Sequence, residues 1–392
     1  MILARSTAIV PAWRLPAAGA LARPLARAAL LAAIGVELAV LAAYLPDTVR
    51  QGWNGPIGDF HNLYIRSRHL DLMNLYSPAV TLALFPIARL PELAAFRAWF
   101  VINVLCVLAA AYLAQACVRG AEARIAAALA VLSLPQMHYA LRLGHLTPLL
   151  TLAALAGFLL MRRNARWGAV VLSLLSLKPQ YAVAPFLWLL VRRQWRLAAT
   201  MLAAAAAMAT VAFVAIGPGS VVTFARLWLD WGPDSTNKLL PTQQSWMYSW
   251  PGFLISAGLR PDPLLTLDLL ALSAAVVVVA WLRVDAAKGA AVAALAMIPL
   301  TPYAQFYDAG LLAAAFALIL HAGLRPGLAA AIVAALYAAA VVTQANTIFP
   351  VRDMLADAHT DGLYWLTPAL LLAIGAIAMT GRAPEAPEAG RW

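Results

Sequence analysis

Apolar runs recur along almost the whole chain and are separated by short polar stretches. A helix needs about 20 apolar residues to cross a bilayer, and shorter apolar helices are tolerated inside a bundle. The pattern predicts twelve membrane-crossing helices, at residues 26-46, 94-117, 122-140, 146-161, 167-177, 180-191, 196-216, 264-284, 288-301, 306-322, 326-345 and 363-380.

The runs 167-177 and 180-191 are each short enough to be parts of one helix. The basic clusters RRNAR (162 to 166) and RRQWR (192 to 196) flank them, and clusters of this kind are typical of cytoplasmic loops. Between them, Pro179 in LKPQ would break a helix. We therefore expect a hairpin that leaves the cytoplasmic side and returns, turning at Lys178.

Composition and charge agree with a polytopic membrane protein. The chain of 392 residues is 64% hydrophobic and 11% charged, which excludes a soluble domain. Its net charge of +11 comes from short basic clusters at the ends of apolar runs, so it indicates topology and not nucleic-acid binding. Twelve crossings place residues 1-25 and 381-392 in the cytoplasm, flanking a single domain at 26-380. The outer loops are then 47-93, 217-262 and 346-362.

Most polar residues that could take part in catalysis or binding fall on the outer face. The stretch GPIGDFHNLYIRSRHLDLMNLYSP, residues 55 to 78, contains Asp59 and His61. A partly desolvated carboxylate here can act as a base, and the alternative is a turn or helix cap. Glu37, near the middle of the first span, has two equal interpretations: a functional acid, or a hydrogen-bond donor or acceptor to a neighbouring helix.

Three cationic or titratable residues occur at the outer ends of helices: Arg142 and His145 in RLGHLTP, and Lys178 in LKPQ. Cations at this depth are often anchors that reach the interface. The functional interpretation is a phosphate clamp, since Lys supplies a compact charge and Arg a forked donor.

Two aromatic segments follow. PTQQSWMYSW, residues 241 to 250, contains Gln243, Gln244 and Trp246, and is typical either of an interfacial aromatic belt or of a platform that binds a sugar. TPYAQFYDAG, residues 301 to 310, places Tyr307 and Asp308 at the start of a span, as substrate contacts or as a helix cap.

The sequence lacks the motifs of several enzyme classes. It has no phosphate-binding glycine loop, HExxH, CxxC or GxSxG, which argues against an ATP-driven pump and against the hydrolases those motifs mark. Cys106 and Cys117 lie too far apart along one helix to pair, and lack the partners of a metal site. We expect neither a metal nor a cofactor.

An ordered set of short motifs resembles glycosyltransferase family 87. The motifs are GDF, LYSP with LP at residues 90 and 91, RLGHLTPLL, LSLKPQ, QQSW and TPYAQFYD, from about residue 55 to 310. This family includes polyprenol-phosphate-mannose-dependent mannosyltransferases. The resemblance implies an all-α polytopic GT-C-type bundle of about 12 transmembrane helices whose extracytoplasmic loops bear the active site.

The resemblance also implies an inverting transfer with Asp59 as general base. Phe60 follows Asp59, so an acidic pair for a metal is not supported, and His145 stands where the family commonly has Gln. The expected partners are a polyprenyl-phosphate sugar donor, a glycan or glycolipid acceptor and membrane lipids, and the resemblance favours mannose as the sugar. The expected location is the inner membrane of a bacterial cell. The expected substrate contacts are Arg142, His145, Lys178, Gln243, Gln244, Trp246, Tyr307, Asp308 and His61.

Two alternatives of other classes remain. A secondary transporter or flippase of a lipid-linked sugar would explain Glu37, but it predicts inverted similarity between halves, which the sequence does not show. A non-enzymatic assembly subunit would have no use for Asp, His and Lys gathered at one outer site.

Overall fold

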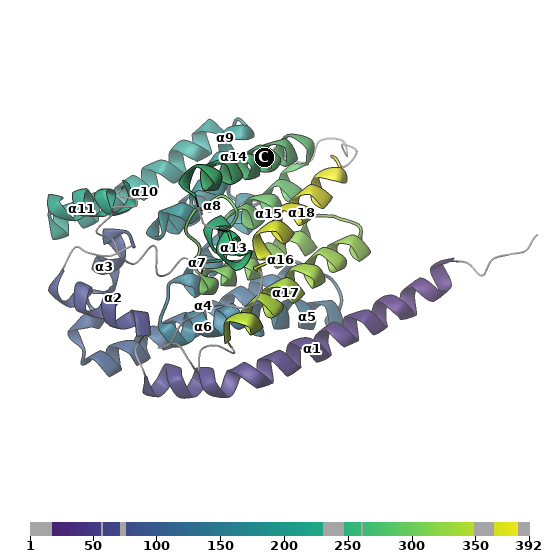
Figure 1. Ribbon diagram of the computed structural model, residues 1–392, viewed down its shortest axis with the longest axis horizontal. Coiled ribbons are helices and arrows are strands. Elements are labelled where there is room, and N and C mark those ends of the chain that lie inside the picture. The colour runs from purple at the N-terminus through teal and green to yellow at the C-terminus, as the bar shows by residue number, and fades with distance from the viewer. Residues whose placement is uncertain are drawn as a thin grey trace, which may run out of the picture.

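The chain folds into a bundle of helices in the computed structural model, which describes residues 18–55, 58–70, 76–229, 247–259, 262–348 and 364–382 (Figure 1). These residues contain no β-strand beyond an isolated bridge between Met247 and Gln305. The α-helices are α1 Ala18–Asn54, α2 Gly58–His69, α3 Pro78–Leu84, α4 Glu92–Ala116, α5 Ala121–Leu132, α6 Pro135–Leu143, α7 Thr147–Met161, α8 Ala165–Leu172, α9 Val183–Val191, α10 Trp195–Ile216, α11 Pro218–Leu229, α13 Trp250–Ser256, α14 Pro263–Arg283, α15 Ala286–Ala296, α16 Leu312–His321, α17 Pro326–Ile348 and α18 Leu366–Met379. The 3₁₀ helices are η1 Ile87–Arg89, η2 Ser173–Leu177, η3 Pro179–Tyr181 and η5 Phe306–Leu311.

Among the residues that the structure describes, five helical segments are long and apolar enough to cross a membrane, and they coincide with the expected spans 26-46, 94-117, 196-216, 264-284 and 326-345. Six shorter apolar helices of 10–17 residues match six more of the expected spans. The expected span 122-140 is interrupted, because α5 ends at Leu132 and Pro135 starts α6. An all-α membrane bundle is therefore confirmed, whereas twelve crossings stay a prediction.

The first outer segment, 47-93, is not the loop that we expected. Helix α1 continues to Asn54, and α2, α3 and η1 follow it. The polar end of α1 stays helical because its side chains meet α6: Thr48 Oγ1 lies 2.9 Å from His138 Nδ1, and Gln51 Oε1 accepts from Arg142 Nε at 2.6 Å. Hydropathy marks where a helix leaves the apolar layer, and such contacts allow it to continue beyond that point. The loop 217-262 likewise contains α11 and α13, and most of 346-362 lies outside the described residues.

The hairpin expected between residues 162 and 194 is confirmed. The helix breaks at Lys178, whose backbone is extended (φ −131°, ψ 85°) as is usual before a proline. Arg162, before α8, and Gln194, after α9, line one pocket together with Ala286 and His321, so both arms of the hairpin end on the same side. We call this side, at the ends of α7, α9, α15 and α16, the basic end.

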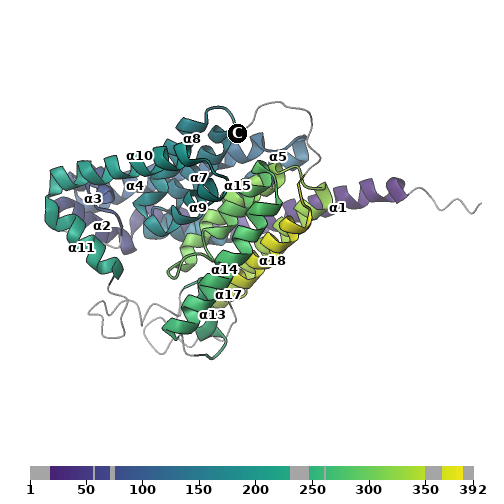
Figure 2. The same ribbon diagram turned by 90° about the horizontal axis from the view of Figure 1, so that it is seen from above.

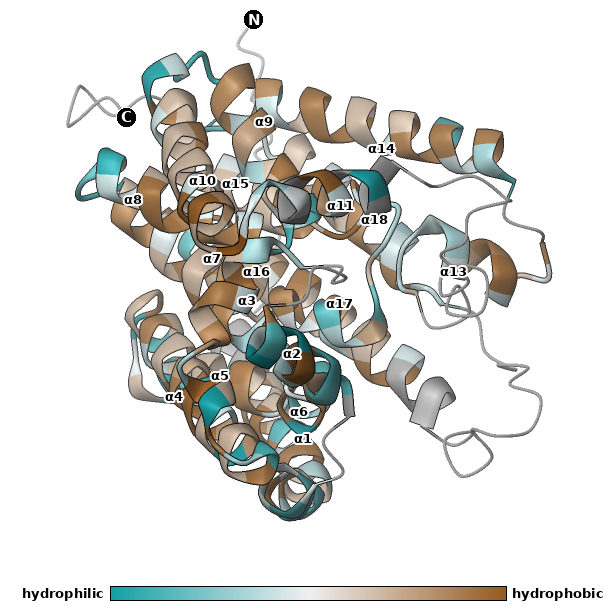
Figure 3. Ribbon diagram, turned by 90° about the vertical axis from the view of Figure 1, so that its left-hand side faces the viewer, coloured by the Kyte–Doolittle hydropathy of each residue, from teal (hydrophilic) through white to brown (hydrophobic). Residues whose placement is uncertain are grey.

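The opposite end, where Lys178 lies, is the site end. Ser77 N donates to Leu177 O there at 3.0 Å, and Tyr248 N donates to Ala304 O at 2.7 Å. From above, α14, α17 and α18 run beside one another on one side of the bundle (Figure 2). When the left-hand side of the molecule in Figure 1 faces the viewer, α2 shows hydrophilic residues, while much of α4, α10 and α14 is hydrophobic (Figure 3).

The centre of the bundle is built from small side chains. Helix α16 is buried from Leu312 to Ile319, and α15 from Lys288 to Ala296. Alanines dominate both helices, and small residues allow helix backbones to approach closely in an apolar medium. A helix that is apolar on all sides belongs in the middle of a bundle. α15 and α16 therefore form the support on which the segments of the site end rest.

The two ends predict opposite labelling by a membrane-impermeant thiol reagent. With Cys106 and Cys117 replaced by alanine, cysteines at exposed Arg163 and Arg193 should react from one side of the membrane, and a cysteine at exposed Leu90 from the other. Lys178 itself is 3% exposed and unsuitable for labelling. Reaction of positions 90 and 193 from the same side would refute this sidedness.

Candidate active site

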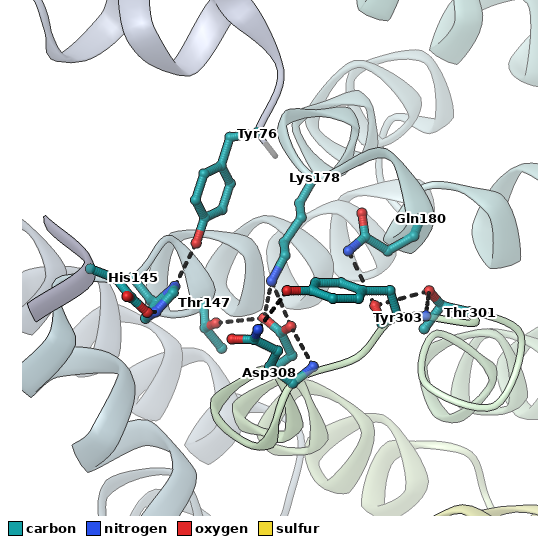
Figure 4. A network of polar contacts seen from close by, with 10 residues as sticks. Tyr76, His145, Thr147, Lys178, Gln180, Thr301, Tyr303 and Asp308 are labelled. Atoms are coloured by element: carbon teal, nitrogen blue, oxygen red, sulfur yellow. Dashed lines mark hydrogen bonds and ion pairs between the residues drawn. The ribbon is translucent and has the colours of Figure 1, made fainter. Parts of the chain in front are cut away.

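Five segments converge at the site end, and Figure 4 shows Tyr76, His145, Lys178 and Asp308 from four of them. They are the start of α2 with Asp59, the turn before α3 with Tyr76, the α6–α7 junction with His145, the η2–η3 junction with Lys178, and η5 with Tyr307 and Asp308. Each segment starts or ends a helix, so the polar side chains lie where the helices stop and the core supports them from below.

His145 bridges Asp59 and Tyr76. Its Nε2 lies 2.6 Å from Asp59 Oδ2, and its Nδ1 lies 2.5 Å from the Tyr76 hydroxyl. The ring of Tyr307 stacks on the imidazole with centroids 3.5 Å apart. Burial, and then the carboxylates of Asp308 and Asp59, raise the pKa of Tyr76 well above its usual value, so the phenol keeps its proton. Tyr76 can therefore donate to Nδ1, which leaves the imidazole proton on Nε2, directed at Asp59.

The backbone before His145 requires a glycine. Gly144 ends α6 with φ +72°, in the left-handed region. A Cβ at this position would lie 2.7 Å from the Cβ of Phe60, next to Asp59 in α2. The Gly144 carbonyl oxygen accepts from Trp99 Nε1 at 2.8 Å. The close approach of α2 to the α6–α7 junction is what brings Asp59 within reach of His145.

Lys178 and Asp308 form a buried ion pair. The ammonium nitrogen lies 2.6 Å from Oδ1 and 2.5 Å from Oδ2, and the two side chains are 4% and 0% exposed. Asp308 also accepts from Thr147 Oγ1 at 3.2 Å and from the backbone N–H of Gln305 at 3.1 Å. The interpretation of Asp308 as a helix cap is confirmed, since Gln305 and Asp308 form a capping box on η5, whereas its contact with substrate stays a prediction.

Aromatic rings enclose the ammonium group of Lys178. Its Nζ lies 5.5, 5.4 and 5.2 Å from the ring centroids of Tyr76, Tyr181 and Tyr307. Rings at this distance attract a cation through their electron-rich faces. Tyr76 and Tyr307 thus contact both the ion pair and His145, and connect the two halves of the site.

Exposure separates Asp59 from the rest of this site. Its side chain is 47% exposed, whereas that of His145 is 2% exposed. Asp308 is fully buried and already bonded, so of the two carboxylates Asp59 is the one that a substrate can reach. One Asp59 oxygen is held by His145, and the carboxylate keeps acceptor capacity at the other.

Two expected site residues lie apart from this cluster. The Nε of Arg142 donates to Gln51 on α1, and its guanidinium lies 4.9 Å from the centroid of the Tyr139 ring. His61 Nδ1 lies 2.5 Å from Glu92 Oε1, at the start of α4. The extension of α1 gives Arg142 a protein partner that hydropathy did not suggest.

Gln243, Gln244 and Trp246 lie outside the described residues. The part of this loop that is described docks near the site, where Thr367 Oγ1 donates to the carbonyl oxygen of Tyr248 and Trp250 Nε1 donates to Ser273 Oγ at 2.9 Å. The remaining candidate, Glu37, is 7% exposed, and its Oε2 has no hydrogen-bond partner within the described part of the chain.

Sequence reasoning missed Tyr76 and Thr147 as site residues. Both occur in motifs that we singled out, LYSP and RLGHLTP. A single hydroxyl group in an apolar stretch of sequence does not by itself indicate a site residue. Their roles follow from contacts with His145 and Asp308. Among the residues that the structure describes, no group of three or more His, Cys, Asp or Glu could hold a metal ion.

Comparison with known protein families identifies the class of protein. A model of glycosyltransferase family 87 matches residues 74–302, more than half of the chain. The chain belongs to glycosyltransferase family 87 and is a membrane glycosyltransferase. No curated protein and no solved structure matches it. Family membership rules against the transporter and the assembly subunit as its main function.

Removal of Asp308 should strongly destabilise the protein. Asp308→Ala leaves the Lys178 ammonium buried without its partner, which typically costs about 3–5 kcal/mol of folding free energy. The double variant Lys178→Met with Asp308→Leu removes both charges and should be more stable than Asp308→Ala alone. Thermal unfolding of the purified proteins in the same detergent measures the order of their stabilities. A double variant less stable than Asp308→Ala would contradict this account.

Proposed function

We propose that this glycosyltransferase moves a sugar from a polyprenyl-phosphate donor to a hydroxyl group of a glycan or glycolipid acceptor, with Asp59 as the general base. The observation that carries the proposal is the half-exposed Asp59 carboxylate, held at one oxygen by His145. A base must present a lone pair to the proton that it takes, in a fixed position. Asp59 meets this requirement, and the buried Asp308 does not.

The proposed transfer is a single displacement. The acceptor hydroxyl gives its proton to Asp59, and its oxygen forms a bond to the anomeric carbon. The bond from that carbon to the phosphate oxygen breaks on the opposite face, so the configuration inverts and polyprenyl phosphate leaves. The donor carries its own activated leaving group, so the reaction needs no nucleotide.

Lys178 is our choice for the group that offsets the charge of the leaving phosphate. An ammonium group has three N–H donors, and Asp308 accepts two of them. The rings of Tyr76, Tyr181 and Tyr307 surround the rest of the group, so we propose that it acts on the phosphate through its charge. A cation fixed before the reaction favours the state in which charge has moved onto the phosphate, because no rearrangement is required as the charge develops.

The proposal also covers the other substrate contacts, the sugar and the membrane. Tyr307 and Asp308 shape the donor site from below, while Gln243, Gln244 and Trp246 are proposed contacts of the sugar or acceptor. Arg142, His61 and His145 complete the proposed contacts, Arg142 and His61 at the rim. Mannose is the sugar that we propose. The membrane that we propose is the inner membrane of a bacterial cell, and the distribution of basic residues supports the extracytoplasmic side for the site.

Asp59→Asn should abolish sugar transfer while the protein remains folded. The amide keeps the shape of the side chain but cannot take the proton, so turnover should fall about a hundredfold or more. Release of polyprenyl phosphate from a polyprenyl-phosphate mannose donor measures the reaction. Asp47→Asn is the matched control, because Asp47 is an exposed carboxylate paired with Arg50 near the end of α1. Turnover of Asp59→Asn above a tenth of wild type would refute the assignment.

Two replacements of His145 should distinguish the effect of its hydrogen bond to Asp59 from the effect of its size. His145→Gln keeps an N–H group that can reach Asp59, and we expect it to retain most of the turnover. His145→Leu removes the donor, leaves Asp59 unrestrained, and should lower kcat about tenfold or more with a smaller effect on the KM for the donor. Steady-state kinetics on both variants provide the test. Equal loss in both would show that His145 does not act through a hydrogen bond to Asp59.

A further inference from the structure

The basic end contains a pocket on the side of the protein opposite Asp59. Its walls come from α7, α9, α15 and α16, and its cavity volume is about 80 Å³. Helix α7 connects the two sites, since Thr147 at its first turn contacts Asp308 and Met161 at its last turn lines the pocket. Fifteen residues of helix span about 22 Å. This pocket is therefore distinct from the candidate active site.

The pocket is apolar inside and polar near its mouth. Its depth is about one helical turn, from Arg162 to Phe158 along α7, or about 5–6 Å. Such a depth accommodates a headgroup-sized molecule rather than an acyl chain. The residues that line it are Phe158, Leu159, Met161, Arg162, Trp188, Gln194, Ala286, Ala287, Ala290, Leu318 and His321.

Three buried polar atoms of the lining have no hydrogen-bond partner in the described part of the chain: Trp188 Nε1, Gln194 Oε1 and His321 Nε2. Trp188 is 3% exposed, and buried polar atoms are normally paired with protein or with a bound molecule. Trp188 is a donor and Gln194 Oε1 an acceptor. The His321 Nδ1 contacts the Cys117 carbonyl oxygen at 3.4 Å as the donor, which leaves Nε2 as an acceptor.

The charge at the mouth favours an anion. Arg162 lines the pocket, and Arg163 follows it before the first arm of the hairpin. Arg192 and Arg193 follow the second arm, next to Gln194 of the pocket lining. The opposing charge is Asp285, but its carboxylate caps α15 and lies 3.4 Å from Lys288 Nζ. An anionic group at Arg162 therefore meets more attraction than repulsion.

We infer that this pocket binds the headgroup of an anionic phospholipid, with phosphoglycerol as the headgroup that best matches its donors and acceptors. The phosphate accepts from Arg162, while the indole N–H of Trp188 faces Gly289 on α15, where a Cβ would lie 2.6 Å from Nε1. The two hydroxyls of the glycerol donate to Gln194 Oε1 and to His321 Nε2. The mouth lies at the level of the helix ends, where a bilayer places its headgroups, while the acyl chains stay in the bilayer.

The inference is tested by native mass spectrometry of the full chain after removal of bound lipid. The probes are phosphatidylglycerol, phosphatidylmethanol, which keeps the anionic phosphate but lacks the hydroxyls, and phosphatidylcholine. Wild-type protein should bind phosphatidylglycerol best, phosphatidylmethanol several-fold more weakly, and phosphatidylcholine weakest. Equal binding of the three lipids would overturn the inference.

Matched variants separate the pocket from general surface charge. Arg162→Gln should weaken binding of phosphatidylglycerol about tenfold, as expected for one charge-assisted hydrogen bond, while the neighbouring Arg163→Gln should leave it near wild type. Gln194→Leu should reduce the preference for phosphatidylglycerol over phosphatidylmethanol. Equal losses in Arg162→Gln and Arg163→Gln would show non-specific attraction to a basic surface and overturn the site.

Soluble glycerol phosphate distinguishes a lipid from a free phosphate compound. We expect it to displace phosphatidylglycerol only at far higher concentration, because it lacks the attachment to the bilayer. Binding as tight as that of the lipid would overturn the lipid assignment. Both arginine variants should retain the unfolding temperature and transfer activity of wild type, so loss of lipid binding cannot be attributed to misfolding.

Discussion

The buried pair of Lys178 and Asp308 is the interaction on which the site end depends. It joins the turn of the hairpin between α8 and α9 to the start of η5, segments 130 residues apart in the chain. An ion pair in an apolar bundle is favourable only when its remaining donors and acceptors are also satisfied. Thr147, the Gln305 amide and three tyrosine rings meet that requirement. The position of the pair fixes where Tyr76 and Tyr307 lie, and these two rings hold His145.

In the reaction that we propose, the two carboxylates of this site have different roles. Asp308 is buried and serves structure, and through Lys178 it keeps a positive charge in place. Asp59 lies at the edge of the cluster, where its second oxygen can meet an acceptor. The difference is one of environment, because both residues begin short helices and both have a polar partner. A rigid core of α15 and α16 beneath the site allows such short segments to hold a defined geometry.

Some of the helices that build the site end also build the pocket at the basic end. Helix α7 contributes Thr147 to one and Met161 to the other, and the hairpin contributes Lys178 to one and Trp188 to the other. A lipid headgroup in that pocket would brace α7, α9, α15 and α16 against one another. Because η5 packs against α6, α7 and α16, and α7 and α16 also line the pocket, the two ends of the molecule share helices.

The sequence by itself determined the all-helical membrane bundle, the break at Lys178 and the family, because each depends on local hydropathy, on proline geometry or on an ordered set of motifs. It also singled out Asp59, His145, Lys178 and Asp308 individually. Tertiary structure alone decided which of them meet, since the partners of His145 and of Lys178 are 69 to 130 residues away. It also decided that Arg142 would turn toward α1 and that Tyr76 would join the site. The physical reason is that a buried charge or hydroxyl must find its partner in space, and no local pattern along the chain records which partner it will be.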